Sequence, residues 1–477
     1  MLHFGAVDYF ATVYVNGNKV GTHKGGYVSF EFDISDFLKV GENIIVVYAE
    51  DDERNPLIPR GKQCEKYNSC VCDYTRTTGI WQTVWLEFMP KSHLQSVKYY
   101  PDVENGTIGM ELSVIGSGEI DILVSFDGKE MGHTVCKSQS SPFMVTIDLA
   151  EKHLWEVGNG RLYDVTFKMN NDVVSSYFGL RQISIDGYKI LINSKPVFQR
   201  LVLDQGFYPD GIYTAPNDEA LLRDIELSLA CGFNGARLHQ KIFEERFLYY
   251  CDKLGYIVWG EYPDWGLDFS NPLNIYSILP EWIEEINRDF NHPSIVCWCP
   301  RNETWYYEKR HQYDDSVVMT YDVTKALDPT RPCVDTSGGF HVKTDIFDVH
   351  NYLQDVDKFK TMYDELENGV LHNDWEYEHK YVGGPVFVSE FGGFKWSSKT
   401  EDAWGYGEGP KTEDEFKERF IKMCEALLNN KKISGFCYTQ LTDVEQEQNG
   451  LYSYDRVAKF DYSDFKESLS IQAAIEK

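Results

Sequence analysis

Apolar and polar residues alternate along the first part of the chain. Over residues 7–86 the alternation runs in short stretches, which are separated by Asn-Gly, Gly-Gly and Gly-Glu-Asn turns. A second group of such stretches follows over residues 94–178. A period of two residues is typical of antiparallel strands with one buried face, and Asn-Gly turns join such strands into hairpins. The pattern therefore predicts two β-sandwich domains, over residues 1–89 and 90–178.

From about Leu180 the period changes to that of helices, which alternate with short apolar runs. One predicted helix starts after Asn217, an N-cap residue, and ends at Gly232, where a left-handed residue is favoured. Eight strand candidates separated by helical segments predict a (β/α)8 barrel over residues 179–477 rather than an open doubly wound sheet. The candidates are Val197–Asp204, Phe233–His239, Tyr256–Tyr262, Ile295–Cys299, Cys333–Thr336, Ile346–Tyr352, Val386–Glu390 and Ile433–Gln440.

Composition and charge narrow the class of protein. The 477 residues carry a formal net charge of -29, and no dense Lys/Arg stripe offsets it, which argues against nucleic acid as a partner. No apolar run approaches the roughly 20 residues that span a bilayer, and the N-terminus lacks the order of a signal peptide. The eleven cysteines lie mostly in apolar segments and suit reduced thiols. We therefore expect a cytoplasmic protein without a membrane partner.

The closest approach to a metal motif is the segment that contains Cys64, Cys70 and Cys72. Its spacing differs from the paired C-x-x-C of structural zinc sites, and no histidine lies nearby. The chain also contains no H-E-x-x-H, no P-loop and no G-x-G-x-x-G after a strand. The sequence therefore predicts no metal and no cofactor.

In barrels of this kind the chemistry lies at the C-terminal ends of the strands. Here these ends are rich in carboxylates, amides and aromatic rings. This mixture suits pyranose sugars, because polar groups bind the hydroxyls while aromatic faces cover the C–H side of the ring. The strand-end residues are Asp204, Gln205, Arg237, His239, Glu261, Asn302, Glu303, Asp335, His350, Tyr352, Glu390, Tyr438 and Gln440.

Two glutamates stand out, because each follows an apolar strand and has an aromatic residue close behind it. On the fourth and seventh strands, Glu303 and Glu390 would face each other across the barrel mouth. Two facing carboxylates are what glycoside hydrolysis needs, one as acid and one as nucleophile or base. An isolated glutamate at a strand end is usually a solvated loop residue, so the interpretation depends on the pair. For Arg237, a structural ion pair and a role in orienting the nucleophile are equally compatible with the sequence.

The tripeptide Asn302-Glu303-Thr304 has a second interpretation as a glycosylation acceptor, which belongs in a surface loop of a secreted protein. The apolar run "SIVCWC" before it and the absence of a signal peptide favour a recessed strand end instead. We therefore interpret the motif as Asn-Glu.

These motifs resemble glycoside hydrolase family 2, the family of bacterial β-galactosidases, β-glucuronidases and β-mannosidases. The segments "VDYFATVYVNG" and "TRTTGIWQTVWLE" are similar to its sugar-binding jelly roll, the middle segment to its immunoglobulin-like domain, and "NHPSIVCWCPRNE" and "FVSEFGG" to its TIM barrel. The resemblance implies this three-domain fold and a retaining exo-β-glycosidase. Family members usually carry further residues before "LHFGAVDY", so it also implies a partial jelly roll with unpaired strand edges.

The resemblance carries roles to individual positions. It implies that Glu303 is the general acid/base, that Glu390 is the nucleophile, and that Tyr352 hydrogen-bonds the nucleophile. The remaining expected substrate contacts are Asn302 at the sugar 2-hydroxyl, Tyr438 as an aromatic platform, Asp204 and Gln205 after the first strand, and Arg237, His239 and His350.

Three departures from the family pattern affect these expectations. His239 lies one place earlier than in the family's Arg-x-Ser-His, so its role is open. The Asn-x-Lys element that binds a glucuronide carboxylate has no clear match, which disfavours a β-glucuronide. A β-galactoside is our first choice of substrate, with β-glucoside and β-mannoside open. The magnesium-site histidine of large β-galactosidases is replaced within "GEYPDWG", in line with the prediction of no metal.

Other classes of function are compatible with parts of the sequence. A carbohydrate-binding or degenerate barrel, inactive because its jelly roll is incomplete, accounts for the strand-end residues without turnover. An acidic scaffolding protein accounts for the length and the charge but not for the paired glutamates. The sequence leaves homo-oligomerisation open.

Overall fold

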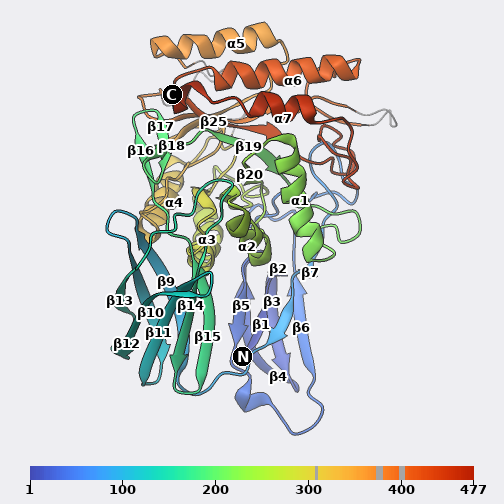
Figure 1. Ribbon diagram of the computed structural model, residues 1–477. Coiled ribbons are helices and arrows are strands. Elements are labelled where there is room, and N and C mark those ends of the chain that lie inside the picture. Colours follow the sequence, from blue (N-terminus) through green and yellow to red (C-terminus); the bar gives the residue numbers. More distant parts are fainter. Residues whose placement is uncertain (307–309, 372–379, 397–402) are drawn as a thin grey trace.

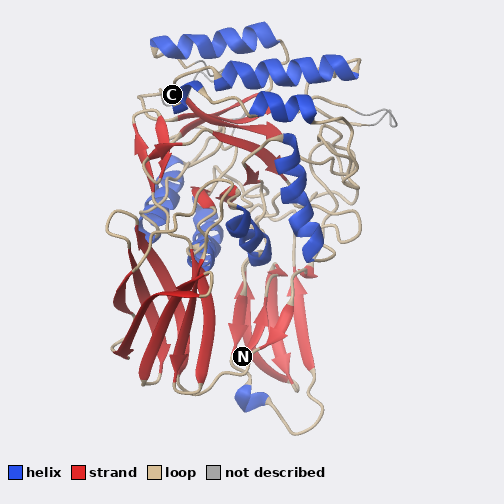
Figure 2. Cartoon of the chain, in the orientation of Figure 1, coloured by secondary structure: helices blue, strands red, loops and turns tan. Residues whose placement is uncertain are grey.

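The chain folds into two small β domains and a larger domain of helices around a curved parallel sheet (Figure 1). The computed structural model describes residues 1–306, 310–371, 380–396 and 403–477. In Figure 1 the two β domains lie next to each other below the parallel sheet, and the C-terminus lies among the helices above it. Figure 2 shows the same division, since strands fill the lower half and nearly all helices lie in the upper half.

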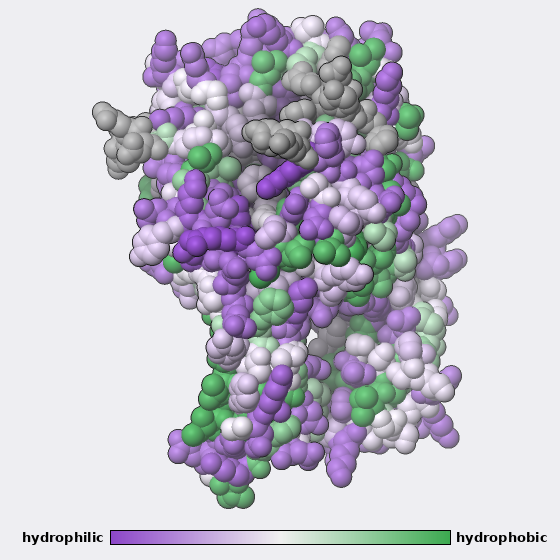
Figure 3. Space-filling model, turned by 180° about the vertical axis from the view of Figure 1, so that it is seen from behind, coloured by the Kyte–Doolittle hydropathy of each residue, from purple (hydrophilic) through white to green (hydrophobic). Residues whose placement is uncertain are grey.

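The first domain consists of short antiparallel strands. They are β1 (Leu2–Phe4), β2 (Val7–Asp8), β3 (Phe10–Val15), β4 (Asn18–Lys24), β5 (Phe30–Phe32), β6 (Ile45–Glu50), β7 (Gly79–Ile80) and β8 (Val84–Leu86). Two three-stranded sheets, ordered β5-β1-β8 and β4-β3-β6, enclose a core with Phe4, Ala11 and Val13, and β2 pairs with β7. The alternation of burial along β3 is the predicted period of two. Strands β6 and β8 expose apolar side chains such as Val46 and Trp85, and Figure 3 shows apolar groups on this lobe at the lower left.

The second domain is a sandwich of two antiparallel sheets. Its strands are β9 (His93–Asp102), β10 (Thr107–Ile115), β11 (Glu119–Phe126), β12 (Lys129–Lys137), β13 (Phe143–Asp148), β14 (Tyr163–Met169) and β15 (Asp172–Phe178). The sheets are ordered β13-β10-β9 and β12-β11-β14-β15. Alternate residues such as Ile108, Ile122 and Phe167 fill one core between them, as the sequence pattern predicts.

A short antiparallel sheet and a seven-stranded parallel sheet follow. The first contains β16 (Ile183–Asp186), β17 (Lys189–Ile192) and β18 (Lys195–Pro196), and the parallel strands are β19 (Gln199–Asp204), β20 (Gly235–Leu238), β21 (Ile257–Glu261), β22 (Ile295–Cys299), β23 (Phe347–Asn351), β24 (Val386–Gly392) and β25 (Ile433–Thr439). The parallel order is β22-β21-β20-β19-β25-β24-β23. Inward-facing residues such as Leu201, Trp259 and Phe387 form one buried cluster inside the curved sheet, as in a barrel core.

The predicted fifth strand, Cys333–Thr336, is not a strand in the structure. The segment lies beside β22 and makes only two isolated parallel bridges, Trp298 to Cys333 and Asn302 to Ser337. The Asp335 carboxylate accepts hydrogen bonds from the backbone of residues 336, 342 and 343, so the chain folds back on itself here. At this position single bridges to β22 therefore stand in place of a strand, while the other seven predicted strands are present.

Helices alternate with the parallel strands. They are α1 (Asp218–Cys231), α2 (Glu245–Leu254), α3 (Ile275–Asp289), α4 (Asp314–Leu327), α5 (Val356–Asp364), α6 (Glu413–Leu428) and α7 (Ser463–Leu469). Helix α1 has the predicted caps, since Asn217 accepts from the Ala220 amide and Gly232 is left-handed with φ 99°. Outward-facing strand residues and the helices share a second, larger buried cluster. None of the helices in the described part of the chain has both the length and the apolar composition of a bilayer-spanning segment.

Candidate active site

The strand ends of the parallel sheet direct a small group of charged side chains inward. In β20, Ala236 and Leu238 belong to the outer cluster, so Arg237 between them faces the inside of the barrel. Glu261 at the end of β21 and Glu390 near the end of β24 meet it there, and all three side chains are nearly inaccessible to solvent. Burial of these charges is compatible with folding because each is paired.

Arg237 is the centre of this group. Its Nε lies 2.5 Å from Glu261 Oε2, its Nη1 donates to Glu390 Oε1 at 2.8 Å, and its Nη2 donates to Asn302 Oδ1 at 2.6 Å. Burial raises the pKa of the Glu261 carboxyl, but Arg237 and His239 together outweigh burial, and the net shift of the pKa is downward. The guanidinium therefore both neutralises two buried carboxylates and fixes their positions. The two roles that the sequence leaves open for Arg237 are thus combined in one set of contacts.

The predicted nucleophile, Glu390, is held on both oxygens. Tyr352 donates its hydroxyl to Oε2 at 2.5 Å, and His350 Nε2 lies 3.4 Å from Oε1. Burial raises the pKa of the Glu390 carboxyl, but His350 and Arg237 together outweigh burial and hold the pKa well below its usual range. The ring of Tyr406 stacks on Tyr352 with the centroids 3.4 Å apart, which fixes the direction of that hydroxyl. Glu390 is thus an ionised and oriented carboxylate.

The predicted acid/base residue, Glu303, lies opposite, beyond the end of β22. Its amide donates to the Ser337 carbonyl at 2.8 Å, and its backbone is left-handed with φ 54°, a conformation that costs energy for a residue with a side chain. His350 Nδ1 lies 2.8 Å from Glu303 Oε1, so the imidazole bridges the two glutamates. One carboxylate oxygen of Glu303 and one of Glu390 lie within 4.8 Å of each other. The predicted pair therefore faces across the barrel mouth.

The tripeptide at Asn302 is not an exposed sequon. Asn302 is only 1% accessible, and its backbone amide donates to Asp264 while its Oδ1 accepts from Arg237. Its buried Nδ2 has no hydrogen-bond partner among the described residues. An amide donor of this kind beside two carboxylates is available to a bound ligand.

The remaining predicted contacts differ in their distance from the carboxylates. His239 is buried with Nδ1 3.0 Å from Glu261 Oε1, and burial lowers the pKa of its imidazole. Gln205 is buried, and its Oε1 lacks a partner within the described chain. Asp204 is in a different environment: burial, and then Asp224, raise its pKa to about 7, and no member of the carboxylate group is among the groups that act most strongly on it. Asp204 lies two residues after Val202, which faces outward, and alternate residues of a strand lie on the same face. Asp204 is therefore not part of the site.

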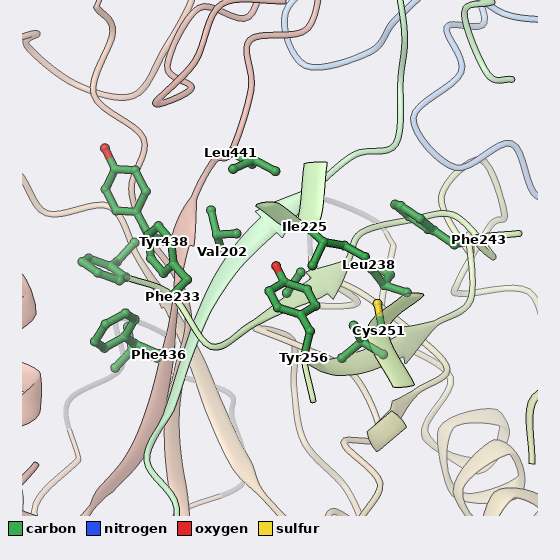
Figure 4. Packing of buried hydrophobic residues seen from close by; sticks show 14 of the residues in the cluster. Val202, Ile225, Phe233, Leu238, Phe243, Cys251, Tyr256, Phe436, Tyr438 and Leu441 are labelled. Atoms are coloured by element: carbon green, nitrogen blue, oxygen red, sulfur yellow. The ribbon is translucent and has the colours of Figure 1, made fainter. Parts of the chain in front are cut away.

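Tyr438 is not an aromatic platform at the mouth. The side chain is fully buried in the outer cluster, 4.8 Å from the ring of Phe420 on α6 and 5.5 Å from Phe391. Figure 4 shows it beside Phe436 and Phe233. Its neighbour Cys437 faces the inner cluster instead. In β25 the inward position near the site is Thr439, whose hydroxyl lies 3.1 Å from that of Tyr352.

Sequence reasoning missed the contribution of the first domain. The segment 53–76 between β6 and β7 reaches the barrel, where Tyr74 donates to Glu447 at 2.5 Å and Gln446 donates to the carbonyls of residues 71 and 73. The ammonium group of Lys62 lies in the same region, buried over the ring of Trp265. The cysteines in this segment resemble a metal motif, but Lys62 before them and Tyr74 after them belong to no motif. Only the contacts with the barrel distinguish them.

Potential metal ligands come together at one place in the described chain. Glu303, His350 and Glu390 have ligand atoms within 4.8 Å of one another. A hydrogen bond from His350 to Glu303 and an ion-pair contact of 3.4 Å with Glu390 account for this arrangement. Cys64 Sγ lies 3.8 Å from Cys70 Sγ, and neither belongs to a group of three ligands in the ranges that the structure covers.

Replacing Arg237 with methionine should destabilise the barrel and alter the titration of the site. Removing one partner of a buried ion pair costs about 3–5 kcal/mol, because Glu261 and Glu390 are left without a counterion. Since Arg237 lowers the pKa of Glu390, its loss raises that pKa. Urea unfolding should therefore show the lower stability, and the acidic limb of the pH dependence of kcat/KM should move to higher pH. A change in stability without any movement of that limb would mean that Arg237 is purely structural.

Comparisons with known proteins give matches to both the first domain and the barrel. The model of the glycosyl hydrolases family 2 sugar-binding domain matches residues 1–90, and that of the family 2 TIM barrel domain matches residues 183–398. A β-galactosidase of Thermoanaerobacter pseudethanolicus is 27% identical over 439 residues, which are 84% of this chain and 52% of that protein. A β-glucuronidase of Sus scrofa is 24% identical over 482 residues, 91% of this chain and 70% of that protein.

Solved structures share the fold. A Lactobacillus rhamnosus β-glucuronidase superposes with a TM-score of 0.82 at 20% identity, covering 100% of this chain and 85% of that one. A β-D-glucuronidase of Dictyoglomus thermophilum gives a TM-score of 0.79 at 21% identity, over 98% and 86% of the two chains. The chain spans about half the length of the first curated relatives it matches. Because the two family models together match most of the chain and the relatives carry the same family's activities, the chain belongs to glycoside hydrolase family 2.

Proposed function

We propose that this protein is a retaining exo-β-glycosidase that releases a terminal β-linked sugar by double displacement. The observation that carries the proposal is the approach of Glu303 and Glu390, which have one oxygen each within 4.8 Å. Retaining glycosidases hold their carboxyl groups about 5–5.5 Å apart, whereas inverting enzymes leave about 6.5–9.5 Å for a water molecule. The short separation supports retention.

In the first step Glu390 attacks the anomeric carbon. Its low pKa keeps the carboxylate ionised, and Arg237 and Tyr352 orient its two oxygens. Glu303 gives a proton to the glycosidic oxygen, so the leaving group departs as a neutral alcohol. A covalent glycosyl–enzyme ester at Glu390 remains.

In the second step Glu303, now a carboxylate, takes a proton from water while the water oxygen bonds to the anomeric carbon, and the bond between that carbon and Glu390 breaks, which frees the Glu390 carboxylate. Two inversions at the anomeric carbon restore the β configuration. The Nδ2 of Asn302, which has no partner among the described residues, would donate to the sugar 2-hydroxyl, an interaction that strengthens as positive charge develops on the ring. Arg237 fixes Asn302 through its Oδ1, so the amide and the nucleophile are positioned by the same group.

A β-galactoside remains the first choice of substrate, and the missing Asn-x-Lys element disfavours a β-glucuronide. The relatives include both β-galactosidases and β-glucuronidases, so they do not separate these sugars. A panel of nitrophenyl β-galactoside, β-glucoside, β-mannoside and β-glucuronide tests the choice directly.

The stereochemical course tests the mechanism. We expect the first sugar released from the best nitrophenyl substrate to be the β anomer, with the α anomer appearing only through later mutarotation. Proton NMR during the first minutes of reaction distinguishes the two. Initial release of the α anomer would contradict double displacement, and binding of the panel sugars without any turnover would favour the carbohydrate-binding alternative.

A further inference from the structure

A cavity of about 320 Å³ is lined by Asn302 and Glu303 together with residues of the first domain and of the loop 264–269, and the proposed mechanism uses only the first two of these residues. Its volume is in the range of small-molecule binding sites. A larger cavity of about 520 Å³ is lined by residues of the second domain and of the barrel, but neither Glu303 nor Glu390 lines it, and its Arg181 and Arg331 side chains donate to backbone carbonyls of the barrel. The smaller cavity is therefore the one next to the chemistry.

Two domains build the walls of this cavity. The first domain contributes the segment 53–65, and the barrel contributes the loop 264–269 and the residues that follow β22. The two loops interlock, because the amides of Arg60 and Gly61 both donate to the Trp265 carbonyl, and a Cβ on Gly61 would lie 2.4 Å from the Gln240 carbonyl oxygen. The wall is thus a fixed surface rather than a chance gap between domains.

Trp265 is the aromatic residue that this interlocking fixes in place. Its amide donates to Gln240 at 2.9 Å, and the buried ammonium group of Lys62 lies 3.8 Å from its ring centroid. The attraction between this cation and one face of the indole fixes the orientation of the ring. The Trp265 side chain is half-buried and lines the cavity. The cavity lining also includes guanidinium groups, which donate hydrogen bonds, and carboxylates, which accept them. These belong to Arg54, Arg60, Glu65, Asp268 and Glu303.

We infer that this cavity is a binding site for a saccharide leaving group, with Trp265 as its stacking platform. The inference rests on the proposed function, because the cavity adjoins Glu303, the residue that would protonate the glycosidic oxygen. A sugar ring presents C–H groups to an indole face and hydroxyls to guanidinium and carboxylate groups, and the lining offers both. The substrate is accordingly a β-linked di- or oligosaccharide rather than a glycoside with a small leaving group.

Paired substrates test the inference. A β-glycosyl fluoride has a leaving group that cannot fill the cavity, whereas the 1,3-, 1,4- and 1,6-linked disaccharides of the same sugar can. The sugar is the one that the nitrophenyl panel selects. The variants are Trp265→Ala and Arg54→Ala, and Tyr276→Ala on α3 serves as an aromatic control, since that side chain is 70% exposed and lies outside the cavity.

We expect Trp265→Ala to lower kcat/KM for the best disaccharide about tenfold relative to the glycosyl fluoride, as loss of one ring contact implies. Arg54→Ala, at an exposed position, should lower the same ratio about threefold. Tyr276→Ala should leave the ratio at the wild-type value. Equal effects of Trp265→Ala and Arg54→Ala on both substrates would overturn the leaving-group site while leaving the glycosidase intact. A wild-type protein that hydrolyses neither substrate would contradict the proposed function itself.

Discussion

Replacing Glu390 with glutamine should lower kcat for the best nitrophenyl glycoside by at least about 10⁴-fold, because the reaction loses its nucleophile. The amide has nearly the shape of the carboxylate, so the contacts with Tyr352 and Arg237 can keep the site assembled. Binding of the sugar should persist, since glutamine removes charge but little volume. Initial rates under saturating substrate measure the loss, and calorimetric titration with the released sugar measures binding.

A matched control separates loss of the nucleophile from loss of the fold. Glu284→Gln changes a glutamate on α3 whose side chain is 43% exposed and contacts only His23 among the interactions described. It should keep wild-type activity, and both variants should unfold near the wild-type temperature. If Glu390→Gln retained more than about a hundredth of the wild-type kcat with its fold intact, another group would have to be the nucleophile.

Replacing Glu303 with alanine should produce a loss that depends on the leaving group. General acid catalysis contributes about 10²–10⁴-fold, and this contribution matters most for a poor leaving group such as a sugar alcohol. Hydrolysis of a disaccharide should therefore fall by this factor, whereas formation of the glycosyl–enzyme from a glycosyl fluoride should be far less affected. Burst kinetics on the fluoride should show the intermediate accumulating, because its hydrolysis has lost the general base.

Azide distinguishes the roles of the two glutamates. In Glu303→Ala the anion can occupy the space of the missing side chain and attack the intermediate from that face, which yields a β-glycosyl azide. In Glu390→Ala it attacks the substrate from the opposite face and yields the α product. NMR of the products identifies each anomer. A β-glycosyl azide from Glu390→Ala would mean that the assignments of nucleophile and acid/base are exchanged.

Much of the fold could be predicted because strands and helices leave a periodic pattern of apolar and polar residues in the sequence. Seven of the eight predicted barrel strands are present, and the caps of α1 lie at Asn217 and Gly232 as expected. The segment around Cys333 shows the limit of this approach. The segment begins with apolar residues and has the length of a short strand. The Asp335 carboxylate, however, accepts hydrogen bonds from the backbone amides of residues 336, 342 and 343, and such contacts leave no periodic pattern in the sequence.

The misplacement of Tyr438 has a related cause. A strand of a parallel barrel is buried on both faces, so its sequence lacks the alternation that would tell inward from outward positions. Tyr438 and Cys437 are both fully buried, yet one packs against α6 and the other inside the barrel. Only the pairing of β25 with its neighbours decides this. The same ambiguity applies to Asp204. The sequence places it at a strand end and predicts a substrate contact, but in the strand period it follows Val202, which faces outward.

The sequence by itself determined the order of the domains, the positions of nearly all strands and the pair of glutamates at two strand ends, because each has a local pattern. The tertiary structure decided which strand-end groups meet. Arg237 joins Glu261, Glu390 and Asn302 across as many as 153 positions, and Tyr74 of the first domain reaches Glu447 across 373. Contacts at such separations depend on the closing of the sheet and the packing of domains, and neither leaves a mark in the residues on either side.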